Sequence, residues 1–213
     1  MGQKIHPVGL RIGGAAPWKS RWFADSRKYK ETLREDLKIR EILMKKLKTA
    51  GVANIEIERS INKLKVFIFV ARPGVLIGRG GTGLTELKKF LLKELKIKSE
   101  NALEIAPQDI RSVDLSAYLV AQGVAEQLIR RLPAQRVMNQ TIDRVMRAGA
   151  KGVRVVVSGR INGAEIARRE WKASGVMPLH TLRQDIDFAS FPALTKSGFV
   201  GVKVWINKGE VEI

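Results

Sequence analysis

The sequence predicts an α+β protein made of an N-terminal arm and two domains. Apolar residues first recur at helical spacing, then alternate as in strands, and then return to helical spacing. The second half places two helical segments before four strand-like ones, an order typical of helices layered on one sheet. With 213 residues, 45% of them apolar, the chain can bury a core in each domain. We therefore expect an arm over residues 1–33, a first domain over 34–108 and a second over 109–213.

The arm mixes Gly, Pro, Trp and basic residues without a steady period, which predicts an extended segment. The first domain is predicted as a three-stranded sheet with helices, and its first two strands form an antiparallel hairpin. Pro73 and Gly74 end the second strand and leave room for about one helical turn before the next glycines. The predicted elements are a helix over 34–49, strands over 55–58 and 64–70, a helix over 84–95 and a strand over 101–107.

The second domain is predicted as two helices on a four-stranded, mainly antiparallel sheet. Its first helix has one apolar face from Val113 to Leu128, and Pro133 interrupts the helical pattern. A second apolar face runs from Val137 to Met146 and stops at Gly149. The strand-like segments are 152–159, about 164–173, 179–188 and 199–207.

The charge of the chain predicts a polyanionic partner. Lys and Arg number 39 against 21 Asp and Glu, which gives a net charge of +18 and a sequence pI near 10.5. Such a basic balance is typical of nucleic-acid-binding proteins. The longest strongly apolar run, Val66 to Ala71, is far too short to span a bilayer, so we expect no membrane partner.

The residues needed for most catalytic or metal sites are scarce. There is no cysteine, and His6 and His180 are too far apart in sequence to form a helical metal-binding pair. Asp185 and Asp187 share a strand face, but no third ligand is visible, and a solvated face is the preferred interpretation. We assign no catalytic residue, no cofactor and no metal ligand.

A glycine-rich loop fits two motifs at once. Gly78, Gly80 and Gly83 have the G-x-G-x-x-G spacing of a dinucleotide-binding turn, and Gly78 with Gly81 has the G-x-x-G spacing of an RNA-clamping loop. A dinucleotide site requires the first glycine to follow directly from a parallel strand, with an acid at a later strand end. Here a Pro-Gly break precedes the loop, and Glu104 falls within a strand. The predicted order of elements instead resembles a type II KH domain.

The KH resemblance implies contact with an RNA backbone. Glycines let the chain approach phosphates closely, and the helix that follows offers free N–H groups. The residues we expect to bind RNA in this domain are Gly78, Arg79, Gly80, Gly81, Arg72 and Lys88.

Longer motifs identify a family. In chain order they are "MGQKIHPVGLRIG", "ARPGVLIGRGG", "GAKGVRVVVSGRINGAEIARREW", "PLHTLRQDIDF" and "GVKVWINKGE". Together they resemble bacterial-type small-subunit ribosomal protein three nearly from end to end. The resemblance implies a place on the head of the small subunit, contact with its RNA and with messenger RNA where that RNA enters, and neighbours that include ribosomal proteins ten and fourteen.

The resemblance also marks one helix of the second domain. In this family that helix carries two arginines and a lysine associated with unwinding incoming messenger RNA, at the positions of Gln135, Arg136 and Asn139. Only Arg136 keeps the pattern, so the sequence leaves open whether unwinding is retained. The surrounding helices stay basic through Arg130, Arg131, Arg144 and Arg147.

Further candidate RNA contacts lie elsewhere in the chain. A basic run in the second domain would release counterions from RNA on binding. Trp171 lies within it and either stacks or packs. The run comprises Lys151, Arg154, Arg160, Arg168, Arg169 and Lys172, and the arm adds Lys4, His6 and Trp22.

We therefore expect a structural, non-enzymatic protein of the small ribosomal subunit. One alternative is an enzyme acting on nucleic acid, such as a DNA-damage lyase or nuclease, although no lysine stands out as an activated nucleophile. A second is a free-standing KH regulator, which leaves the second domain unexplained. We expect a cytoplasmic location on the ribosome, and a plastid stroma fits the sequence equally.

Overall fold

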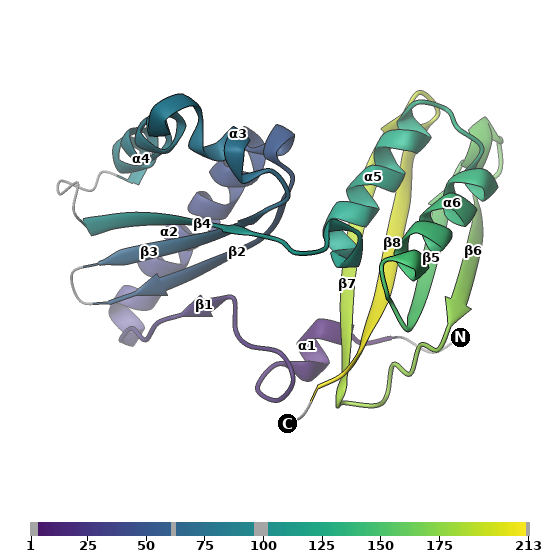
Figure 1. Ribbon diagram of the computed structural model, residues 1–213, viewed down its shortest axis with the longest axis horizontal. Helices are drawn as coiled ribbons and strands as arrows, with labels where there is room; N and C mark the ends of the chain where they lie inside the picture. Colours follow the sequence, from purple (N-terminus) through teal and green to yellow (C-terminus); the bar gives the residue numbers. More distant parts are fainter. Residues whose placement is uncertain (1–3, 61–62, 96–101, 212–213) are drawn as a thin grey trace. The chain divides into compact units, whose positions relative to one another are not determined.

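The computed structural model describes residues 4–60, 63–95 and 102–211. It divides into two compact units, Trp18–Arg111 (the N-terminal unit) and Met1–Pro17 together with Ser112–Ile213 (the C-terminal unit). Each unit is a sheet covered by helices (Figure 1), so the predicted α+β class is confirmed. No helix in these ranges is long and apolar enough to cross a membrane.

The N-terminal unit is a four-stranded sheet in the order β1-β2-β3-β4. Strand β1 runs parallel to β2, β2 and β3 form the expected antiparallel hairpin, and β4 runs parallel to β3. The elements are β1 (Ser20–Arg21), α2 (Ser26–Lys46), β2 (Val52–Arg59), β3 (Leu64–Val70), α3 (Pro73–Ile77), α4 (Thr82–Leu95) and β4 (Leu103–Asp109).

The core of this unit lies between the sheet and its helices. Alternate residues of β3 point inward, as the sequence predicted, because successive side chains of a strand point to opposite faces. Ile39 and Leu43 of α2 and Leu91 of α4 are fully buried against them. The inward residues of β3 are Leu64, Val66, Ile68 and Val70.

The C-terminal unit is a four-stranded antiparallel sheet in the order β6-β5-β8-β7. Helices α5 and α6 lie side by side over one face of it (Figure 1) and bury a large apolar cluster there. The elements are α1 (Pro7–Arg11), α5 (Ala117–Ile129), α6 (Ala134–Arg147), β5 (Gly152–Gly159), β6 (Arg168–Gly175), β7 (Gln184–Thr195) and β8 (Gly198–Glu210).

A smaller apolar cluster lies on the opposite face of this sheet, which we call the helix-free face because neither α5 nor α6 covers it. It contains Val156, Ile186 and Trp205, with Phe188 packed against them. Helix α1 is in contact with β7, and the His6 ring meets the Phe188 ring edge-on at 4.9 Å. The start of the chain therefore covers part of the helix-free face.

Several element boundaries differ from the prediction. Helix α2 begins at Ser26, so it includes the end of the predicted arm, and β1 and α1 also interrupt that arm. Strand β7 begins at Gln184 rather than near residue 179, because the preceding segment is held in a loop by buried contacts to Arg11. Val113 is 40% exposed in a short 3-10 turn before α5 and does not belong to the apolar face of that helix. Asn101, the first residue of the predicted third strand, lies outside the described residues.

Candidate RNA-binding surface

The glycine loop connects α3 to α4 and divides into two functional halves. A Cβ on Gly83 would lie 2.7 Å from the carbonyl oxygen of Leu76, and a Cβ on Gly78 would lie 2.9 Å from the Gly83 nitrogen. Both distances are shorter than a carbon atom tolerates, so Gly78 and Gly83 are required by the close approach of α3 and α4. Gly83, the last glycine of the G-x-G-x-x-G pattern, thus has a packing role.

Gly80 and Gly81 form the open half of the loop. Both have positive φ, 61° and 79°, and a Cβ on either would meet nothing within 4 Å. Their backbone therefore faces free space where a ligand could approach, beside the first turn of the long helix α4. The side chain of Arg79 lies outside the described part of the structure, and only its backbone, in a short 3-10 segment, is placed.

A shallow hollow adjoins α4 and strand β4. Lys88 is half-buried in its wall, while Arg72 is exposed at the start of α3. The hollow combines an apolar floor with ammonium groups, which suits a nucleotide with an apolar base face and a charged phosphate. It is lined by Lys63, Leu84, Thr85, Lys88, Leu103, Glu104 and Ile105.

The structure revises one argument against dinucleotide binding. Strands β3 and β4 are parallel, so a parallel crossover does surround the loop. However, helix α3 separates β3 from Gly78, whereas a dinucleotide turn follows its strand directly. Glu104 is exposed on β4 and pairs with Lys65 at 3.7 Å. The geometry therefore still favours the RNA-clamping interpretation.

In the C-terminal unit, the α5–α6 turn and the β5–β6 loop form a basic end. Asn162 Oδ1 accepts a hydrogen bond from the backbone N–H of Ala134 at 3.3 Å, which joins the loop to the start of α6. Arg131 and Asn162 both have positive φ, 64° and 56°, which is uncommon outside glycine. The basic end, as we use the term, consists of the exposed residues Arg130, Arg131, Arg136 and Arg160.

The charges of the basic end are not neutralised locally. None of its four arginines forms a salt bridge with another residue in the described ranges. Arg160 instead donates to the backbone oxygens of Ala164 and Ser197, at 2.9 and 3.5 Å, which holds its side chain over the loop. Guanidinium groups without a carboxylate partner, gathered from the α5–α6 turn, the first turn of α6 and the β5–β6 loop, form a surface suited to phosphates.

The outward face of α6 contains the helix positions that the family resemblance marked. Gln135, Arg136 and Asn139 are all exposed, because Val137 and Met138 take the buried side of the helix. The Nζ atom of Lys172, on strand β6, donates to Asn139 Oδ1 at 2.5 Å. A neighbouring strand thus places an ammonium group beside the position where the family pattern has a lysine.

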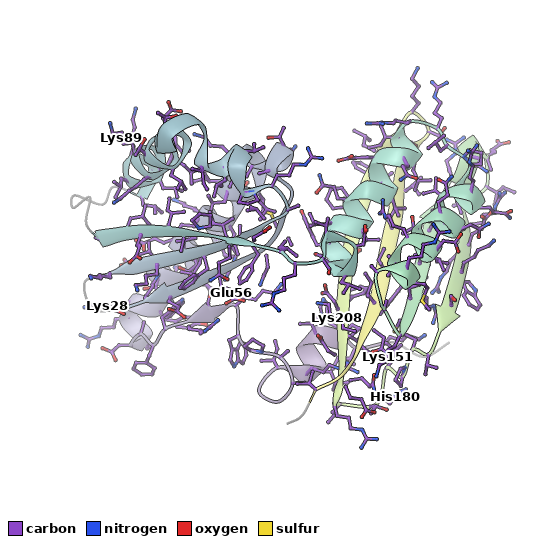
Figure 2. All side chains as sticks on the ribbon, in the orientation of Figure 1. Lys28, Glu56, Lys89, Lys151, His180 and Lys208 are labelled. Atoms are coloured by element: carbon purple, nitrogen blue, oxygen red, sulfur yellow. The ribbon has the colours of Figure 1, made fainter. Side chains whose placement is uncertain are left out.

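The remaining candidates of the helices and strands are dispersed. Arg144 pairs with Asp114 at 2.9 Å, Arg168 pairs with Glu170 at 2.8 Å, and Arg147 is exposed near the C-terminal end of α6. Lys151 precedes β5, and its backbone N–H donates to the carbonyl oxygen of Asn207 at 2.9 Å, next to Lys208 in the chain (both lysines are labelled in Figure 2).

Strand β5 therefore separates Lys151 from the basic end. The eight residues of the strand span about 25 Å between Lys151 and Arg160. The structure does not bring all the predicted basic residues into one site.

The arm candidates are engaged in structural contacts. Trp22 Nε1 donates to Asp36 Oδ2 at 2.7 Å, and its ring packs against the Tyr29 ring at a tilt of 51°, with the centroids 5.3 Å apart. His6 Nδ1 accepts from the backbone N–H of Gly9 at 3.3 Å and so caps α1. Lys4 is exposed. The geometry thus gives Trp22 and His6 packing and capping roles in addition to any RNA contact.

Sequence reasoning missed Arg11. Its guanidinium is 3% exposed and donates to four backbone oxygens, those of Pro7, Leu179, Thr181 and Gln184, at 2.6 to 3.1 Å. Burial lowers the pKa of Arg11, and the nearby charge of Asp185 raises it in part. Since Arg11 joins the arm to residues far along the chain, no local pattern could have revealed it.

One of the two aspartates considered as metal ligands, Asp187, caps a helix, and the other, Asp185, lies near the charge of Arg11. Asp187 Oδ2 accepts from the backbone N–H of Ala117 at 2.9 Å and so caps the start of α5. In the described part of the chain, no group of three or more His, Cys, Asp or Glu could hold a metal ion.

Comparisons with known proteins define the class first. A family model described as "KH domain" matches residues 38–118, and one described as "Ribosomal protein S3, C-terminal domain" matches residues 124–206. The matches therefore indicate a ribosomal protein with a KH domain.

Curated relatives then give the family. Three of them are each called "Small ribosomal subunit protein uS3": those of Lactobacillus delbrueckii subsp. bulgaricus (49% identical), Synechococcus sp. strain JA-3-3Ab (48%) and Desulfitobacterium hafniense (49%). Each alignment covers 99% of this chain and 92%, 86% and 94% of the relative, respectively. The chain belongs to the uS3 family of ribosomal proteins. The resemblance stated from the motifs is confirmed, and this membership favours a structural protein over an enzyme.

Proposed function

We propose that this chain is a structural protein of the head of the small ribosomal subunit, that it binds the RNA of that subunit, and that it lines the channel through which messenger RNA enters. The observation that carries the proposal is the match to uS3 relatives over 99% of the chain. Neighbouring head proteins, including ribosomal proteins ten and fourteen, complete its surroundings in this proposal. Its location is then on the ribosome, in the cytoplasm.

The glycine loop is proposed as the RNA-backbone contact of the N-terminal unit. The open backbone of Gly80 and Gly81 and the start of α4 provide N–H groups, while Lys88 and Lys63 provide charge along the hollow beside it. Such contacts position RNA without reading its sequence.

The basic end is proposed as the surface that meets messenger RNA. Its four arginines carry unneutralised charge, and Lys172 supplies an ammonium group beside Asn139. This arrangement supports electrostatic contact with a phosphate backbone at the outward face of α6.

Sedimentation of a cell extract on a sucrose gradient tests the proposal as a whole. We expect this protein, followed by mass spectrometry, to migrate with the small subunit at moderate salt and to stay there at high salt. Migration as a free protein, or with other RNA, contradicts the proposal and favours the free-standing regulator or the nucleic-acid enzyme.

A double variant tests the glycine loop. Replacing Arg79 and Gly80 with Asp sets negative charge against phosphate, and we expect the affinity of the purified protein for RNA to fall about tenfold, independently of sequence. The measurement is fluorescence anisotropy with two unrelated RNA sequences, and Glu86→Gln on the exposed side of α4 is the control. Unchanged affinity means that the loop faces away from RNA.

A further inference from the structure

The helix-free face of the C-terminal sheet has an open half with an ordered pattern of side chains. Val153, Val155 and Val157 of β5 point to the helices, so the residues between them point to the opposite face. The strand register then sets the outward residues in three rows across the sheet. These rows are Arg169, Ser158, Gly201 and Pro192; Trp171, Val156, Lys203 and Ser190; and Ala173, Arg154, Trp205 and Phe188. We call the first two rows, together with Arg154, the platform.

Trp171 is fixed on the platform by a stacked arginine. The Arg154 guanidinium lies 4.9 Å from the Trp171 ring and 5.7 Å from the Trp205 ring. Trp205 is 9% exposed, whereas Trp171 is 57% exposed, so the stack has one buried end and one open end. A cation over an indole face is an attractive contact that holds the ring in place. The open part of the Trp171 ring is thus a preorganised apolar surface.

The platform carries unneutralised positive charge. Arg169 and Lys203 are exposed on it, neither forms a salt bridge with a described residue, and the three rows contain no Asp or Glu. The Nε atom of Arg154 is buried without a hydrogen-bond partner among the described residues. An anionic ligand would therefore meet three cations and no repulsive carboxylate.

We propose that the platform binds single-stranded RNA, with a base stacked on Trp171 and phosphates contacting Arg169 and Lys203. A sheet face with an exposed aromatic ring beside basic residues is a surface that proteins use to stack unpaired bases. Trp171 is the one large exposed apolar side chain within these rows. Leu194 and Phe199 are exposed one row further along β7 and β8, but the row of Gly201 and Pro192 lies between them and Trp171, so the platform lacks the continuous apolar core of a protein interface. The inference rests on the RNA-binding function proposed above and adds a second site to it.

Binding of a short labelled oligoadenylate to the full chain, measured by anisotropy at several salt concentrations, tests the platform. We expect Trp171→Ala to weaken binding on the order of tenfold and to leave the salt dependence unchanged, because stacking is lost without loss of charge. Trp171→Phe keeps a ring and is expected to recover part of the affinity. Lys203→Gln is expected to reduce the slope of log K against log salt by about 0.7, the value for one phosphate contact on a single strand.

Two control variants match these changes in the N-terminal unit. Trp18 is 63% exposed, so Trp18→Ala removes an equally accessible indole. Lys45 is exposed on α2 and pairs with Glu41 at 2.7 Å, so Lys45→Gln removes a neutralised cation from a helix to which no RNA contact is assigned. Both controls are expected to bind oligoadenylate like the unaltered chain. Circular dichroism of each variant verifies the fold, and Trp171→Phe keeps the test valid if the alanine variant unfolds.

The outcomes separate this inference from the proposed function. If Trp171→Ala and Trp171→Phe bind like the unaltered chain while the double variant Arg79→Asp, Gly80→Asp weakens binding, RNA binding by the platform is wrong and RNA binding by the glycine loop is supported. If none of these variants changes the affinity for RNA, the proposals that the platform and the glycine loop bind RNA are both wrong.

Cross-linking in assembled small subunits gives a second readout. Ultraviolet light should link a peptide containing Trp171 to a nucleotide. Amine cross-links from Lys203 to another protein, with no nucleotide on the Trp171 peptide, would instead show a protein partner on this face and overturn the proposal.

Discussion

The two units have the same architecture, a four-stranded sheet with helices over one face, but their helix-free faces differ in charge. In the N-terminal unit Arg21 contacts both Glu56 and Glu58, and Lys65 contacts Glu104. Arg21 and Lys65 thus each have a carboxylate beside them. In the C-terminal unit the corresponding face presents Arg154, Arg169 and Lys203 with no acid in their rows.

The difference shows that the choice of cross-strand partner, and not the fold, decides which face carries unneutralised positive charge. Oppositely charged residues placed across neighbouring strands neutralise each other and leave a solvated surface. Cations placed beside aromatic and small polar residues keep their charge available to a ligand. Two sheets of similar architecture can therefore present either a neutralised, solvated surface or a surface whose charge is available to a ligand.

The largest effect is expected from Asp36, which ties the arm to the N-terminal sheet. Its buried carboxylate accepts hydrogen bonds from Ser20, Trp22 and Arg59. Asp36→Ala leaves the half-buried Arg59 guanidinium poorly paired, and we expect the free energy of unfolding of this unit to fall by about 3–5 kcal/mol. Amide hydrogen exchange should show lost protection in α2 and β2 and unchanged protection in β5 and β8.

Glu31→Ala, on the exposed side of α2, is the control for Asp36 and should change little. Equal loss of protection in both sheets would contradict this expectation, because the two sheets would then unfold as one cooperative unit.

The next largest effect is expected from Arg11, which holds α1 near the apolar part of the C-terminal face. Arg11→Met leaves buried carbonyl groups without a donor, and we expect the C-terminal unit to lose about 2–3 kcal/mol of unfolding free energy. Denaturant unfolding, with amide exchange to separate the units, measures the loss. Arg27→Met, an exposed arginine of α2, should leave stability within experimental error. A loss of unfolding free energy confined to the N-terminal unit would contradict the structural role assigned to Arg11 in the C-terminal unit.

A pair of glycine variants distinguishes packing from ligand access in the loop. Gly83→Ala drives a methyl group against the Leu76 carbonyl, and we expect a loss of about 1–3 kcal/mol in the N-terminal unit. Gly80→Ala meets no atom within 4 Å, so only its left-handed backbone opposes the change, at about 1 kcal/mol. Thermal unfolding measures both. If the order of the two losses is reversed, the proposed division of the loop is wrong.

The smallest effect is expected from the ion pair on the N-terminal face. Lys65 and Glu104 are both roughly half exposed, and a pair of this kind contributes at most about 1 kcal/mol. Glu104→Gln should therefore leave unfolding nearly unchanged. It should also unmask Lys65 and raise affinity for RNA slightly at low salt, an increase that disappears when salt is added. Unchanged affinity at low salt would mean that neutralisation of Lys65 by Glu104 does not explain the difference between the two faces.

Much of the fold and part of the site could be predicted from local patterns. The alternation of Leu64, Val66, Ile68 and Val70 predicted which side of β3 is buried, and β5 lies over the predicted residues 152–159. The order of elements around Gly78 to Gly81 predicted the KH domain that the family model matches, and the end-to-end motifs predicted the family. These features depend on periodicity or on contiguous residues, so the sequence displays them directly.

Contacts between residues that are far apart in the sequence depend on the tertiary structure and could not be predicted from local patterns. Arg11 meets the carbonyl of Gln184, Lys172 meets Asn139, and Arg154 stacks between Trp171 and Trp205, and none of these pairs shares a period or a motif. The gathering of Arg130, Arg131, Arg136 and Arg160 at one end likewise depends on the Asn162 hydrogen bond between two loops. Local propensity and hydrophobic patterning determine the helices and strands. Strand register and helix packing determine which side chains come into contact, and the chemistry of a binding surface depends on those contacts.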